Sequence, residues 1–159
     1  MLRNLLLWVS LLLCGVAVAG EAEKPKVILS VQGKVAAPLE LTLADLDKLP
    51  QKKMTVPTPW YPEPQTFEGP LLRDVMKLAK SKGGNTLKLQ ALNDYTIDIP
   101  GKDMQQYDVI VASRLNGQTM SVRAKGPLFI MYPFDQHEKL RNTEYYRRCA
   151  WQLKQIVVE

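Results

Sequence analysis

The chain has 159 residues, enough for one domain with a hydrophobic core. Its formal net charge is +5 at pH 7, but the lysines and arginines are scattered rather than clustered, which argues against a nucleic-acid-binding protein. The single histidine excludes a multi-histidine metal site.

Residues 1–19 have the pattern of a secretory signal peptide. One arginine precedes an apolar run over residues 5–16, and Ala17 and Ala19 form a small-x-small cleavage site. We therefore expect general secretory export to the periplasm or the medium. Cleavage would leave a domain of residues 20–159 with no stable membrane insertion.

Two other interpretations of residues 1–19 agree less well with the sequence. An uncleaved membrane anchor needs a longer apolar run. A lipoprotein attached through Cys14 needs a small residue before the cysteine, where this chain has Leu13. Removal of the signal leaves Cys149 as the only cysteine, which excludes an internal disulfide and a metal site built on cysteines.

The first predicted elements are a strand and a short helix. Apolar and polar residues alternate from residue 27 onward, and we expect a kink or bulge at Gly33. The helix begins at Thr42, which can form a capping box with Asp45, and it ends at Pro50.

The stretch from Thr55 to Met76 divides into two halves. The first half contains four prolines and two large aromatic residues, so it is neither a regular helix nor a central strand. The second half predicts a helix with Gly69 at the cap and Pro70 at the first helical position, ended by Gly83 and the following glycine.

The remaining pattern predicts several strands. Residues 86–92 and 95–99 alternate around an Asn-Asp turn, with Tyr95 expected inside. An Asn-Gly pair at 116–117 predicts a hairpin. Further strands are expected at 107–115, 127–133 and 150–158, the last with a bulge between Leu153 and Ile156, and a short helix is expected within 135–148. The whole pattern indicates a single α+β domain.

Five pieces of this sequence, in this order, resemble the oxidoreductase molybdopterin-binding domain of sulfite oxidases and related periplasmic oxidoreductases. They are VQGKVAAPLELTLADLDKLP, FEGPLLRDVM, NDYTIDIP, LNGQTM with KGPLFIMYP, and CAWQLKQIVV. The resemblance spans nearly the whole predicted mature chain. It implies a sulfite oxidase-like fold of mixed small sheets with a few short helices.

In active members the resemblance implies a pterin-bound molybdenum held by one cysteine thiolate. That cysteine lies between the Leu-Pro helix end and the next glycine. This chain has Thr58 there and no cysteine, and a threonine hydroxyl is a poor substitute for a soft thiolate. The family is also usually exported folded through a twin-arginine signal, whereas this chain has one arginine. We therefore expect no cofactor, no metal ligands and no catalytic residues. In the alternative interpretation, in which the protein is an active oxidoreductase, the expected cofactor is molybdopterin.

Two segments supply candidate ligand-binding or partner-binding residues. The proline-rich loop stiffens Thr58, Trp60 and Tyr61, and rigid aromatics suit recognition, although both rings could simply pack on the edge of the core. The second segment combines aromatic, basic and polar groups that could clamp a carboxylate or phosphate or form an ordinary solvated face. Its candidates are Tyr132, His137, Arg141, Tyr145 and Arg148.

Three functions remain open from the sequence. The first is a secreted periplasmic binding or adaptor module that binds a small-molecule ligand or the periplasmic domain of a membrane signalling protein. The second is a genuine molybdopterin-dependent oxidoreductase with an atypical metal ligand, and the third is a purely structural interaction protein. We expect Cys149 to be a small buried core residue.

Overall fold

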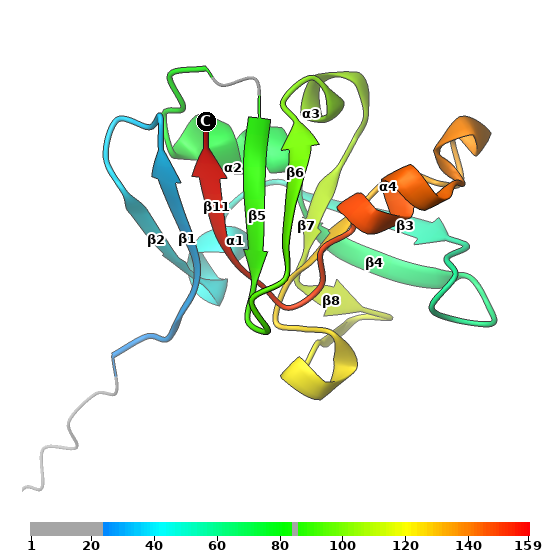
Figure 1. Ribbon diagram of the computed structural model, residues 1–159. Helices are drawn as coiled ribbons and strands as arrows, with labels where there is room; N and C mark the ends of the chain where they lie inside the picture. The colour runs from blue at the N-terminus through cyan, green and yellow to red at the C-terminus, as the bar shows by residue number, and fades with distance from the viewer. Residues whose placement is uncertain (1–23, 84–85) are drawn as a thin grey trace, which may run out of the picture.

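A computed structural model describes residues 24–83 and 86–159 (Figure 1). The predicted signal peptide lies outside these residues. The largest of three sheets has the order β2-β1-β11-β5-β6, in which β1 and β11 are parallel and the other neighbours are antiparallel. Its strands are β1 (Val27–Gly33), β2 (Leu39–Thr42), β5 (Thr86–Ala91), β6 (Thr96–Pro100) and β11 (Leu153–Val158).

The other two sheets are smaller. One has the order β3-β4-β8-β9, with β3 (Gln51–Val56), β4 (Gln65–Pro70), β8 (Arg114–Leu115) and β9 (Gln118–Thr119). The second pairs β7 (Ile110–Ala112) with β10 (Phe129–Met131). Short helices connect the sheets: α1 (Leu43–Asp47), α2 (Leu72–Leu78), α3 (Asp103–Gln106), α4 (Thr143–Arg148), and the 3-10 helices η1 (Val122–Ala124) and η2 (Glu138–Leu140).

This arrangement confirms the expected α+β architecture of mixed small sheets and few helices. Helices α1 and α2 lie behind the five-stranded sheet (Figure 1). Tyr146 of α4 packs against Trp60, in the loop that connects β3 to β4. The buried cluster includes side chains from all three sheets, among them Leu89, Phe67 and Phe129. Within residues 24–83 and 86–159, no helix is both long and apolar enough to cross a membrane.

Several local predictions are confirmed. Thr42 and Asp45 form the capping box of α1, with the Asp45 amide donating to Thr42 Oγ1 over 3.3 Å. Asn116 and Gly117 have φ values of 50° and 79° and connect β8 to β9, as expected for a type I′ hairpin. The register of β11 shifts between Leu153 and Gln155, where the sequence predicted a bulge.

The sequence missed the β3–β4 hairpin and misassigned Gly69 and Pro70. Both residues end β4, and α2 begins only after Leu71. Gly69 is needed for a different reason from capping: a Cβ there would lie 2.1 Å from the Val111 carbonyl oxygen, so glycine allows two backbones to approach closely.

Other boundaries also differ from the predictions. Helix α2 ends at Leu78, well before Gly83, while Gly84 lies outside the described residues. The strand expected at 107–115 is split at Ser113. Gly33 ends β1 with a φ of 91°, and the bulge between β1 and β2 lies elsewhere, where the register changes between Val27 and Leu29.

Candidate functional site

The described surface contains a pocket of about 280 Å³ beside α4. It is formed where the proline-rich loop, the β5–β6 turn, and the α4 segment with the residues that follow it meet. Its lining residues are Trp60, Asn93, Tyr95, Thr143, Tyr146, Arg147, Cys149, Ala150 and Trp151. Most of the pocket lining is therefore aromatic or otherwise apolar, and it includes a few polar side chains.

Trp60 is the part of the proline-rich loop that builds this pocket. Its half-buried ring lies 5.3 Å from Phe129, 6.1 Å from Tyr146 and 5.8 Å from Trp151 between ring centroids. The Tyr146 and Trp151 contacts are edge-on, an arrangement that aromatic quadrupoles favour. The loop thus fastens one wall of the pocket to the core through ring packing.

The other two candidates on this loop do not line the pocket. Tyr61 packs 6.4 Å from Phe67, and burial raises the pKa of its hydroxyl. Lys125 Nζ lies 5.5 Å from the Tyr61 ring and 5.7 Å from the Trp151 ring. Thr58 Oγ1 is buried and has no hydrogen-bond partner among the described residues.

Helix α4 is positioned by bonds at both of its ends. At the N-terminus the Asn142 side chain accepts from the amides of Glu144 and Tyr145 at 2.9 and 3.4 Å. At the C-terminus the Tyr95 hydroxyl donates to the Arg147 carbonyl at 3.0 Å, which ties the β5–β6 turn to the helix across the pocket. Both contacts hold the pocket wall in one position.

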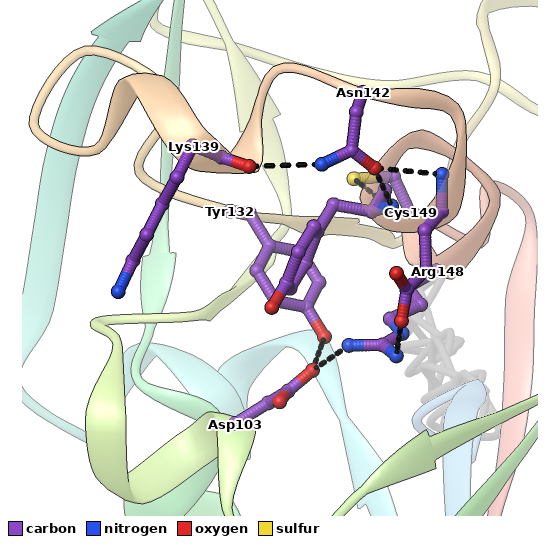
Figure 2. Close-up of polar contacts among 8 residues, drawn as sticks. Asp103, Tyr132, Lys139, Asn142, Arg148 and Cys149 are labelled. Atoms are coloured by element: carbon purple, nitrogen blue, oxygen red, sulfur yellow. Dashed lines mark hydrogen bonds and ion pairs between the residues drawn. The ribbon is translucent and has the colours of Figure 1, made fainter.

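A buried polar cluster fixes α4 from another side (Figure 2). Asp103, at the start of α3, is 1% exposed. Its Oδ2 accepts from the Tyr132 hydroxyl at 2.7 Å and from Arg148 Nη1 at 2.7 Å. Arg148 Nη2 also pairs with Glu144, and the guanidinium carbon lies 4.6 Å from the Tyr145 ring. We call Asp103, Tyr132 and Arg148 the Asp103 anchor.

The charges of the anchor follow from its surroundings. Burial raises the pKa of Tyr132, and the neighbouring Asp103 charge raises it further, so this hydroxyl stays protonated and donates. Burial acts to lower the pKa of Arg148, but the Asp103 charge leads the opposing effects that raise it overall. Burial and then Tyr107 raise the pKa of Tyr145. The anchor is therefore a charge-assisted network in which Asp103 accepts from the Tyr132 hydroxyl and from the Arg148 guanidinium.

The second group of candidates divides among three environments. Tyr132, Tyr145 and Arg148 come together around Asp103, whereas His137 packs edge-on against Tyr107 at 5.2 Å. Arg141 is separate: its Nε donates to the Phe134 carbonyl at 2.7 Å.

Sequence reasoning missed several residues of this region. Nothing in the local sequence pattern around Asp103 marks it as buried. Tyr95 was expected inside the sheet but is 40% exposed, because it lies in the turn before β6 and faces α4. The expected identity of Cys149 as a small buried residue is confirmed: it is 2% exposed.

The donors do not fit a thiolate-bound molybdenum. The proline-rich loop contains no cysteine. Burial raises the pKa of the Cys149 thiol, which donates to the Tyr145 carbonyl at 3.5 Å. Among residues 24–83 and 86–159, no three His, Cys, Asp or Glu side chains are grouped to hold a metal ion.

Comparison with known proteins supports the fold. No protein-family model matches the sequence, and no curated protein matches it. A solved structure that is similar is the sulfane dehydrogenase SoxCD from Paracoccus pantotrophus, with a TM-score of 0.62 and 16% identity. The match covers 82% of this chain and 37% of that chain. The expected sulfite oxidase-like fold is thus confirmed as a distant structural relationship.

Proposed function

We propose that this protein is an exported, non-catalytic binding module whose aromatic pocket takes a small, mainly apolar ligand. One observation carries the proposal. Trp60, Tyr95, Tyr146 and Trp151 come from three separate parts of the chain and line one pocket. Aromatic side chains from several segments, with a few polar groups among them, are characteristic of small-molecule sites.

The dimensions of the pocket limit the ligand. Its volume of about 280 Å³ lies near the lower end of the range for ligand sites. A ligand with a single ring system matches that space better than a large cofactor. The ring packing of Trp60 and the bonds at the ends of α4 hold the walls in advance, which lowers the entropy lost on binding.

The chemistry of the site favours binding over reaction. The Cys149 thiol is buried with a raised pKa and is therefore a poor nucleophile. Asp103 is committed to Tyr132 and Arg148. A degenerate active site on an oxidoreductase fold fits these facts better than a molybdopterin enzyme. Stoichiometric molybdenum or tungsten with bound pterin, in protein purified from its native compartment, would overturn this assignment.

Export and a downstream partner complete the proposal. The signal-peptide pattern of residues 1–19 supports a periplasmic or secreted location, which fractionation and N-terminal sequencing of the mature protein would test. The proposed receiver is the periplasmic domain of a membrane signalling protein. A pull-down from envelope extract, with and without ligand, tests that step.

The binding function is tested by titration with 3-phenylpropanamide, a neutral single-ring probe, followed by tryptophan fluorescence and by amide chemical shifts. We expect shifts at Trp60, Tyr95 and Trp151. Trp60→Ala should weaken binding roughly tenfold, since a buried aromatic contact contributes on the order of 1–2 kcal/mol.

Tyr61→Ala is the matched control, because Tyr61 lies on the same loop but outside the pocket lining. The affinity of Tyr61→Ala for 3-phenylpropanamide should stay within about twofold of that of the unmodified protein. Equal losses in both variants, or shifts confined to another surface, would contradict a ligand site at this pocket.

A further inference from the structure

The charges around the aromatic pocket are unequal in sign. None of its lining residues is an aspartate or glutamate, whereas one of them, Arg147, is a cation. In the described part of the chain, the Arg147 guanidinium has no ion-pair partner. The nearby carboxylates are engaged elsewhere: Glu144 pairs with Arg148, and Asp94 pairs with Lys154. Arg147 is therefore an exposed cation available to a ligand.

A second cation lies against the same aromatic cluster. Lys125 Nζ is 5.7 Å from the centroid of the Trp151 ring and 5.5 Å from that of Tyr61. A group of aromatic rings often binds a cationic ligand such as a quaternary ammonium. In this protein the Lys125 ammonium already lies over the Trp151 ring. A second cation would be repelled by it, and no carboxylate on the pocket lining offsets that repulsion. The local charge disfavours cationic ligands.

The polar groups at the edge suit an anion. The backbone of Arg147 is held by the Tyr95 hydroxyl at 3.0 Å, so its long side chain starts from a fixed point beside the pocket. A guanidinium presents paired donors that match the two oxygens of a carboxylate. The Asn93 amide and the Thr143 hydroxyl are on the same lining and can donate further hydrogen bonds.

We propose that the pocket selects small aromatic acids, with the ring packed against Trp60 and Trp151 and one carboxylate facing Arg147. This inference rests on the proposed binding function and specifies its ligand class. Arg147 is the residue that determines the charge preference, and the aromatic walls supply most of the affinity.

Three probes with the same ring and chain length test the preference: 3-phenylpropanoate, 3-phenylpropanamide and 3-phenylpropylamine. Calorimetric titration should show the carboxylate binding roughly two- to fivefold more tightly than the amide, as an exposed ion pair allows. The amine should bind more weakly than the amide. The preference should shrink when the salt concentration rises from about 0.02 M to about 0.5 M, because salt screens exposed charges.

Arg147→Gln and Arg123→Gln form a matched pair. Both remove one exposed positive charge, but Arg123 lies in η1 and does not line the pocket. We expect the carboxylate preference to disappear in Arg147→Gln and to persist in Arg123→Gln. Amide binding should be unchanged in Arg123→Gln.

The outcomes separate this inference from the function on which it rests. Equal affinity for the three probes, tightest binding of the amine, or a carboxylate preference that survives in Arg147→Gln would overturn the inference and leave the binding function standing. If none of the probes binds, both the binding function and the inference fail.

Discussion

Two segments form walls of the aromatic pocket, and they are held in different ways. The α4 segment is fixed by the Asp103 anchor, by the Asn142 cap and by the Tyr95 hydroxyl. The proline-rich loop, residues 57–64, is held by ring packing of Trp60 and by the fixed φ angles of its prolines. Within it, the Thr58 hydroxyl is buried with no partner among the described residues.

The two segments therefore show two physical ways to hold a pocket wall in place: buried hydrogen bonds in one segment and apolar packing in the other. Buried hydrogen bonds to charged groups specify one geometry, and they are costly to break because the remaining partner is left unpaired. Apolar packing on a stiff loop tolerates small changes, since contact area varies gradually with shape. We therefore expect substitutions in the anchor to have large effects and substitutions in the loop to have small ones.

Asp103→Asn should produce the largest effect. It keeps the shape of the side chain but removes the charge opposite Arg148, which is 13% exposed. Leaving this guanidinium without its buried partner should lower the free energy of unfolding by about 3 kcal/mol. Urea denaturation followed by circular dichroism measures the change.

Glu144→Gln supplies the control for this prediction. Glu144 pairs with the same arginine but is 65% exposed, so its removal should change the free energy of unfolding by less than about 1 kcal/mol. A similar loss in both variants would show that burial does not distinguish the two ion pairs, and the contrast between the two walls would fail.

Local sequence signals predicted part of this architecture well. The capping box at Thr42, the Asn116-Gly117 hairpin and the bulge near Leu153 depend on residues close together in the chain. The β3–β4 hairpin was missed because the four prolines between its strands indicate an irregular loop and not a tight hairpin turn. Gly69 was read as a cap, although its role depends on the distant Val111 backbone.

The candidate site was predicted less completely for the same reason. Trp60 was identified from its rigid loop, but the other residues of the pocket come from the β5–β6 turn, from α4 and from the residues that follow α4. The order of the strands in the sheets brings Tyr95 and Trp151 to the pocket. The hydrophobic periodicity of a sequence does not specify that order. Asp103 and Arg148 are 45 residues apart, and only the tertiary structure pairs them.

Ionisation of Cys149 should make the free energy of unfolding depend on pH in the alkaline range. It lines the pocket directly after α4, and burial raises the pKa of its thiol above the ordinary value of 9.0. A raised pKa in the folded state gives stability that is complete below about pH 9 and is lost as pH rises toward the folded value. Between about pH 9 and 10, the free energy of unfolding should fall by up to about 1.4 kcal/mol per pH unit.

The comparison variant is Cys149→Ala, measured by urea denaturation across the same pH interval. Its overall stability should be somewhat lower because a buried atom is lost, but its slope against pH should be shallower. An unchanged slope would mean that the thiol ionises as readily in the folded chain as in the unfolded one.

The smallest effect is expected at Thr58, and it has the opposite sign. Thr58→Val replaces a buried hydroxyl that lacks a partner with a methyl group of similar size, and it should raise the free energy of unfolding by about 1 kcal/mol. Thr55→Val is the matched change at a satisfied hydroxyl, since Thr55 Oγ1 lies 2.8 Å from Thr66 Oγ1 on the exposed side of the β3–β4 hairpin. Its effect should stay within about 0.5 kcal/mol. Urea titrations of the two variants decide the question: if Thr58→Val destabilises the protein, the hydroxyl has a bonding partner in solution, and the loop is held by more than packing and proline stiffness.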